Sequence, residues 1–178
     1  MLEAICFKNG KLKILNQLKL PLIEEYEDIL SVKDAWNAIH SMKVRGAPAI
    51  AIVGVLSIAV EIQNQDIQNS VEKDKNKLLQ LIKSFCSYIC TARPTAVNIK
   101  RETDLLIDFC NELSQNNNID FDGFIKNVVE YSEKLLQTDV SVNRAIGDHG
   151  AQHILANGNN QMVTILTHCN TGSLATGN

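Results

Sequence analysis

An uncharged stretch of fourteen residues, Ala47 to Val60, constrains this chain more than any other feature of its sequence, APAIAIVGVLSIAV. A helix that is apolar on nearly every side has to be buried, because none of its faces is compatible with water. The run is too short to cross a bilayer, which needs about 20 apolar residues. The sequence therefore predicts a central buried helix from Pro48 to about Ile62.

The residues before this helix form a compact turn, Val44-Arg45-Gly46-Ala47-Pro48. Proline is favoured at the first helical position, because its missing N–H would have no partner there in any case. Orphan N–H groups and the helix dipole attract anions, glycine permits close approach, and arginine offers a fork to phosphate or carboxylate. Two interpretations follow from the residues alone: an anion site, or only a tight turn before a core helix.

A second turn that contains proline, Thr91 to Thr95, separates two further predicted helices. Apolar residues recur at helical spacing from about Lys77 to Cys90, and Thr95 is the expected N-cap of a helix from Ala96 to about Leu113. Arg93 stands in this turn as Arg45 stands in the first. The chain has four arginines against thirteen lysines, and two of the four lie in such turns. The placement of scarce arginines in these turns favours a guanidinium that donates two hydrogen bonds to a phosphate. The alternative is a surface arginine that caps a helix or snorkels.

A β-hairpin is predicted at the start of the chain. Leu2 to Phe7 and Leu12 to Leu20 are apolar or alternating segments around Asn9-Gly10, the strongest short-range hairpin signal. Pro21 is expected to end the second strand. Ser31 is then the predicted N-cap of an amphipathic helix that leads to the Arg45 turn.

The second half of the chain is predicted to be helical up to Asn157. Polar connections are expected at residues 63–76 and 114–120. A helical pattern is expected at 121–137, and a further segment at 139–155 continues it, interrupted by Gly147 and Gly150. Cys86 and Cys90, and likewise His149 and His153, are four residues apart. Neither pair has the further ligands that a metal site needs, so we predict no metal site.

A short β-branched run, Met162 to Leu166, predicts a buried parallel strand that ends in Thr167-His168-Cys169-Asn170-Thr171-Gly172. Ligands gather at the carboxyl ends of such strands. Cys169 is there either a reactive or polarising thiol or a packed one. Because a lone parallel strand has no partner, we expect the chain to be cut off shortly after a second domain begins. The predicted domains are residues 1–156 and 157–178, an α+β fold that moves into α/β.

Composition narrows the class of protein. A net charge of −3 gives no electrostatic footprint for nucleic acid or an anionic membrane. The first ten residues lack the zones of a signal peptide. Five scattered cysteines fit reduced thiols in a cytosolic protein better than a disulfide framework.

Three motifs together resemble one family. VRGAPAIAIVG, ARPTAVN (Ala92 to Asn98) and ILTHCNTGSLAT (Ile165 to Thr176) are similar to the methylthioribose-1-phosphate isomerases of methionine salvage, which belongs to amino-acid biosynthesis. These are related to the alpha, beta and delta subunits of a translation initiation exchange factor. The resemblance covers nearly the whole chain, although Gly177-Asn178 departs from the usual continuation into a Rossmann-like domain.

The resemblance implies roles for individual residues. Arg45, Gly46 and Ala47 would bind the sugar phosphate, Arg93 would also contact substrate, and Cys169 would assist the transition state. The family's acid/base aspartate lies in a part that this sequence does not contain, so the chain alone is expected to be inactive. The resemblance implies no metal or organic cofactor.

The same resemblance implies a homodimer for the full-length proteins and a cytoplasmic location, with the nucleus as a second one. The alternative is a non-catalytic protein that binds sugar phosphate or regulates, like the exchange-factor subunits.

Overall fold

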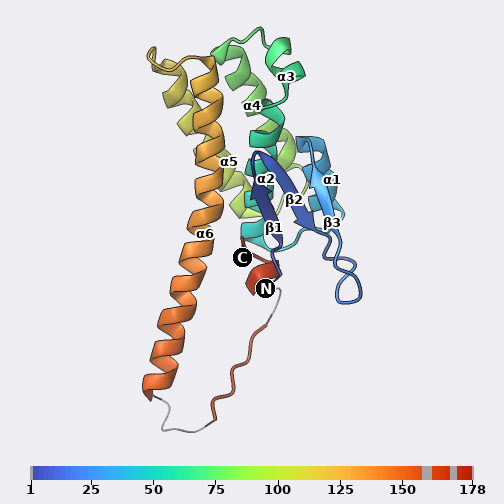
Figure 1. Ribbon diagram of the computed structural model, residues 1–178, viewed down its shortest axis with the longest axis vertical. Coiled ribbons are helices and arrows are strands. Elements are labelled where there is room, and N and C mark those ends of the chain that lie inside the picture. The colour runs from blue at the N-terminus through green and yellow to red at the C-terminus, as the bar shows by residue number, and fades with distance from the viewer. Residues whose placement is uncertain (1, 158–161, 169–171, 178) are drawn as a thin grey trace.

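The computed structural model describes residues 2–157, 162–168 and 172–177. A small antiparallel sheet packs against one side of a helical bundle, and one long helix extends well beyond both (Figure 1). The elements in chain order are β1 (Ile5–Lys8), β2 (Lys11–Leu15), β3 (Tyr26–Ile29), α1 (Val32–His40), α2 (Ala47–Ile62), α3 (Gln65–Ser70), α4 (Lys75–Cys90), α5 (Val97–Gln115), α6 (Phe121–Asn157) and the short 3-10 helix η1 (Gly172–Leu174).

The predicted hairpin is confirmed. β1 pairs with β2 in antiparallel register, and Asn9 and Gly10 both have positive φ, as a tight two-residue turn requires. The second strand ends at Leu15 and not at Pro21, because the chain leaves the sheet there and returns as β3. The sequence pattern did not predict this third strand, which pairs with β2 in antiparallel register.

Helix α1 begins as predicted. The Ser31 hydroxyl accepts a hydrogen bond from the Asp34 N–H at 3.1 Å, and the Asp34 carboxylate accepts one from the Leu30 N–H at 3.2 Å. These bonds satisfy backbone donors that the helix itself leaves without partners. Beyond α1, Met42 takes a positive φ and turns the chain toward Arg45.

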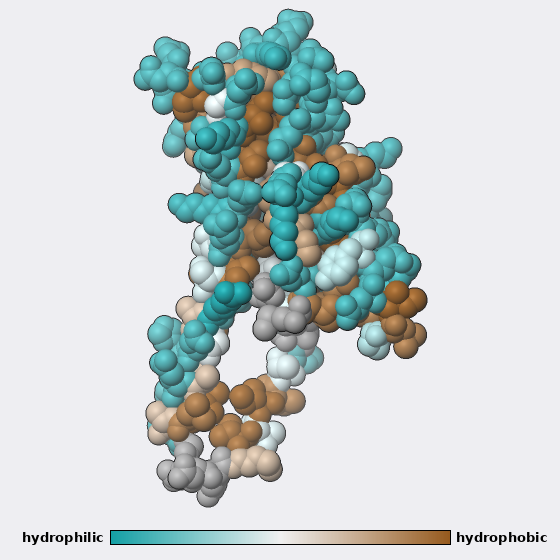
Figure 2. All heavy atoms as spheres, viewed as in Figure 1, coloured by the Kyte–Doolittle hydropathy of each residue, from teal (hydrophilic) through white to brown (hydrophobic). Residues whose placement is uncertain are grey.

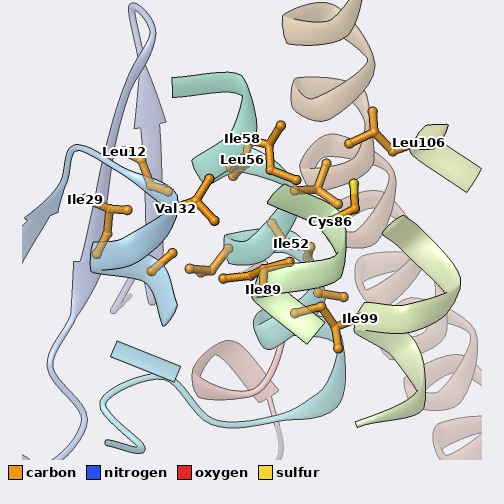
Figure 3. Packing of buried hydrophobic residues seen from close by; sticks show 14 of the residues in the cluster. Leu12, Ile29, Val32, Ile52, Leu56, Ile58, Cys86, Ile89, Ile99 and Leu106 are labelled. Carbon is orange, nitrogen blue, oxygen red and sulfur yellow. The ribbon is translucent and has the colours of Figure 1, made fainter. Parts of the chain in front are cut away.

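Helix α2 lies at the centre of the fold, as its sequence predicts. Twelve of its sixteen residues are buried, and it contacts both sides of the molecule, including β1, β2, α1 and α4 to α6. Figure 3 shows Ile52 and Leu56 among residues from the sheet, α1, α4 and α5. Full burial of each such side chain contributes roughly 1.5–3 kcal/mol. Burial of α2 is therefore a principal source of the bundle's stability.

Helices α4 and α5 also form close to their predicted bounds. The connection before α4 contains a short additional helix, α3. Thr95 is not the N-cap of α5: that position belongs to Ala96, which makes no side-chain cap bond. Ala96 is extended and its N–H donates to the Arg93 carbonyl at 2.9 Å, so the helix begins one residue later than expected.

Helix α6 is one continuous helix of 37 residues, so the second predicted segment continues the first as expected. Gly147 and Gly150 do not break it, because a glycine in a helix costs only about 1 kcal/mol relative to alanine. Its first part packs on the bundle through Phe124, Ile125 and Val128. Among the described residues no helix combines the length and the apolar character needed to cross a membrane.

The predicted strand at Met162 to Leu166 is wrong for this structure. Residues 162–168 form neither helix nor strand, and Met162 and Leu166 are each 94% exposed. A strand needs a paired neighbour, and none is recorded beside it in the described chain. Figure 2 shows the resulting hydrophobic surface around the far end of α6. The Rossmann-like start thus has no strand here, and the domain boundary after residue 156 stays a prediction.

Candidate functional site

The Arg45 turn sits at the start of the central helix. Gly46 is the N-cap of α2, with φ +94° and ψ 132°, a conformation that only glycine adopts without strain. Pro48 lies in the first helical turn, as predicted. The sequence thus places an arginine, a glycine and an exposed alanine, Ala47, in succession at the positive end of a buried helix.

Arg45 carries an orphaned polar atom. The side chain is half-buried, and its Nε is inaccessible to solvent and has no hydrogen-bond partner in the structure. A buried donor left without a partner costs about 1–3 kcal/mol, and more when it is charged. Such a donor beside a helix N-terminus can bind an oxyanion by donating a hydrogen bond to it.

The N-terminal start of α2 has fewer free N–H groups than the sequence pattern predicts. The Ala49 N–H donates to the Ala175 carbonyl at 3.0 Å, so the chain's last described segment lies on the helix start. A Cβ on Gly46 would come within 2.4 Å of the Ala175 Cα. Because Pro48 has no N–H, the remaining donors of this turn are those of Gly46 and Ala47.

Residues 174–177, called segment 174–177 below, are fixed by other elements as well. The Gln17 side-chain amide donates to the Leu174 carbonyl at 2.6 Å. The Gly177 N–H donates to the Asp139 carboxylate, also at 2.6 Å. The segment therefore joins the end of β2, the start of α2 and the middle of α6, close to the N-terminus in Figure 1.

A buried polar group supports the chain before Arg45. The Gln17 N–H donates to the Lys43 carbonyl at 3.0 Å, and the Lys43 ammonium lies 2.6 Å from the Glu27 carboxylate. Asn16 donates to the same carboxylate at 2.7 Å. Asn16 and Gln17 are each 4% exposed. Sequence reasoning missed both residues. The available signal was a pair of side-chain amides directly after an apolar strand, where buried polar residues are unusual.

The Arg93 turn is attached to the same helix on another side. Ile89 and Ile99, which flank the turn, approach the position of Gly54 in α2 to about 3.4 and 3.0 Å from an added Cβ. The Trp36 indole N–H donates to the Thr91 hydroxyl at 2.8 Å and ties the turn to α1. Arg93 itself is half-buried. The structure therefore anchors both predicted arginine turns on α2.

Cys169 lies outside the described residues, so its predicted role is not tested here. Thr167 and His168 before it are exposed. Of the other cysteines, Cys86 and Cys110 are buried, and burial raises the pKa of each thiol to about 12. Thiols with such pKa values are weak nucleophiles at neutral pH, which fits packed residues.

The remaining polar candidates do not gather into a metal centre among the residues that the structure describes. His149 and His153 are exposed on α6. A cavity of about 540 Å³ lies between β1 and the middle of α6, and its lining includes Cys6, Arg144 and Asp148. Burial, with the nearby Glu3 carboxylate, raises the pKa of the Cys6 thiol. Neither Arg45 nor Arg93 lines this cavity.

The fold combines a small sheet, a helical bundle and an arginine–glycine turn at the start of a buried central helix. This combination defines a known class of proteins. Residues 43–177 match the Initiation factor 2 subunit family. The chain belongs to this family.

Two kinds of relative are similar to the chain. A methylthioribose-1-phosphate isomerase of Drosophila persimilis is 43% identical over 182 residues, which cover 98% of this chain and 49% of that protein. The crystal structure of 5-methylthioribose 1-phosphate isomerase from Pyrococcus horikoshii OT3 matches with a TM-score of 0.84 and 28% identity, over 99% of this chain and 46% of that one.

The delta subunit of translation initiation factor eIF-2B from A. fulgidus matches with a TM-score of 0.79 and 29% identity, over 99% of this chain and 47% of that one. The chain thus spans about half the length of the relatives that it matches.

Proposed function

We propose that this chain supplies the sugar-phosphate-binding part of an aldose–ketose isomerase that converts 5-methylthioribose 1-phosphate to 5-methylthioribulose 1-phosphate. The observation that carries the proposal is the buried, unpartnered Nε of Arg45 beside the start of α2. A substrate phosphate would supply the missing acceptor. The 43% identity to a methylthioribose-1-phosphate isomerase supports this choice of phosphate ester.

The phosphate has a clear set of donors in this proposal. Arg45 offers charged N–H groups, and Gly46 and Ala47 offer the two backbone N–H groups that segment 174–177 leaves unused. Charge-assisted hydrogen bonds from such groups are roughly twice as strong as neutral ones. Arg93 is the proposed second cationic contact to substrate. Holding the phosphate at these points fixes the sugar for reaction.

The chemistry then needs groups that bind the sugar ring. The anomeric carbon carries the phosphate, so the furanose has to open before an aldose can become a ketose. An acid protonates the ring oxygen, and hydrogen moves between C1 and C2. We propose that Cys169 steadies the charge that develops. No carboxylate of this sequence is assigned the acid/base role, and we therefore propose that the chain alone does not turn over substrate.

A second function is favoured by a different observation. The delta subunit of an initiation factor shares the fold at 29% identity, about the same as the archaeal isomerase. A non-catalytic protein that binds a sugar phosphate or regulates a partner would keep Arg45 and its turn without isomerase chemistry. The two functions differ in whether a complete protein with these motifs turns over methylthioribose 1-phosphate. We further propose a homodimer for such a complete protein.

The test is calorimetric titration of the purified chain with 5-methylthioribose 1-phosphate. Arg45→Ala is expected to weaken binding about 10- to 100-fold, because a hydrogen bond to a charged group contributes about 1.5–3 kcal/mol. Arg101→Ala is the matched control, since Arg101 is an arginine of α5 whose side chain is 75% exposed. Equal affinity of wild type and Arg45→Ala would overturn the phosphate role. Turnover by the chain alone would overturn its proposed inactivity.

A further inference from the structure

Three parts of the fold, far apart in the sequence, hold the backbone of segment 174–177. The contacts come from the Gln17 side chain, the Ala49 N–H and the Asp139 carboxylate. Resting on the proposed function, we propose that Gln17 is a positioning residue that holds this segment on the Arg45 turn. Its role is to keep the Ala175 carbonyl on the Ala49 N–H, which leaves the Gly46 and Ala47 N–H groups for the phosphate.

Gln17 is suited to this role because it touches both sides of the junction. Its backbone N–H donates to the Lys43 carbonyl, two residues before Arg45, at 3.0 Å. Its side-chain amide donates to the Leu174 carbonyl at 2.6 Å. The residue is 4% exposed, so water does not readily replace either bond. One buried residue thus spans the chain before Arg45 and the chain after Cys169.

The contact also divides the donors of α2 between two tasks. With segment 174–177 in place, the Ala49 N–H is used by the Ala175 carbonyl. Pro48 has no N–H, so an anion at this helix start meets only the donors of Gly46 and Ala47. These two are the residues next to Arg45. Gln17 therefore directs a phosphate toward the arginine without touching the phosphate itself.

The first experiment measures amide hydrogen exchange in the ligand-free chain by NMR. Gln17→Met keeps the length of the side chain and removes its donor. The amides of Ala49 and Gly177 are expected to exchange about 3- to 10-fold faster in this variant, the size expected for one lost hydrogen bond. Amides in the middle of α2 are expected to keep their rates.

Gln68→Met is the matched control. Gln68 donates its side-chain amide to the Ile62 carbonyl at 3.2 Å, so it makes the same kind of bond at the opposite end of α2. Its loss is expected to leave Ala49 and Gly177 unchanged. Asp139→Ala removes the acceptor of the Gly177 N–H by an independent route and should also release the segment. Unchanged Ala49 exchange in Gln17→Met would overturn the proposal.

The second experiment separates positioning from stability. In the wild type, 5-methylthioribose 1-phosphate is expected to shift the amide signals of Ala175 and Gly177, because the Ala175 carbonyl accepts from the Ala49 N–H in the first turn of α2, close to Arg45. Gln17→Met is expected to lose the Gly177 shift while affinity falls less than in Arg45→Ala. A retained Gly177 shift would overturn the positioning role. Absence of any binding by the wild type would instead contradict the proposed function, and the exchange experiment would still test Gln17.

Discussion

The turns at Arg45 and Arg93 contain similar residues but differ in what lies against them. Both place an arginine close to a proline at a helix start. Gly46 packs against the backbone of Ala175, and Arg45 has a buried Nε without a partner. At the second turn, Pro94 and Thr95 are exposed and Ala96 is an uncapped N-cap. Similar local sequences therefore form one covered, constrained helix start and one open start.

The largest expected effect comes from the residue on which the covered turn depends. Gly46→Ala places a side chain at φ +94°, which costs about 1–3 kcal/mol, and drives a Cβ into the Ala175 backbone. We expect lower stability in urea unfolding and loss of the Ala49–Ala175 hydrogen bond. Gly147→Ala is the control, because an added Cβ there meets nothing within 4 Å. Wild-type stability for Gly46→Ala would show that the two turns are equally tolerant.

A smaller effect, of opposite sign, is expected at the arginine of the same turn. Arg45→Met removes a buried donor that has no partner and keeps the apolar stem. The ligand-free chain is therefore expected to gain up to about 1–2 kcal/mol of stability in urea unfolding, while phosphate-ester binding weakens as in Arg45→Ala. Arg93→Met is the matched change in the open turn and is expected to give no such gain. A loss of stability in Arg45→Met would mean that its guanidinium stabilises the free protein.

The smallest effect is expected at Ala96, at the open helix start of α5. Ala96→Asp adds a side-chain acceptor at the N-cap of α5 and is expected to raise the midpoint of thermal unfolding, with a gain of about 1 kcal/mol. Ala96 is half-buried at the edge of the core, whereas an added Cβ at Gly46 would meet the Ala175 backbone. Ala96→Leu, which cannot cap, is the control. Equal midpoints for the two variants would show that Ala96 is not acting as the N-cap.

Sequence patterns predicted the elements whose burial is local and periodic. The uncharged run predicted α2 to within one residue of its start at Ala47, and Ser31 marked the start of α1. The strand β3 was missed because only Ile29 of its four residues is buried, so its sequence YEDI has little apolar alternation. The continuation of the helical pattern in α6 was predicted, but the interruption at its two glycines was wrong.

Long-range backbone contacts could not be predicted in the same way. The Ala49 N–H meets a carbonyl 126 positions further along the chain, and no side-chain pattern encodes that bond. Gln17 likewise donates to a backbone oxygen, so its partner has no sequence signature. The apolar run at 162–166 did indicate strand-forming residues, but pairing depends on a neighbour that the run itself does not specify.

Only the first part of helix α6 is packed against the hydrophobic core. Its last fully buried residue is Ser132, and the helix continues for a further 25 residues, which is ~37 Å of helix. That distal part contains Gly147 and Gly150, so little tertiary packing offsets their low helix propensity. The free energy needed to open the helix locally therefore falls from the value of the core toward zero at Asn157. The long helix in Figure 1 is continuous in geometry, but its packed part and its distal part differ in the free energy needed to open them.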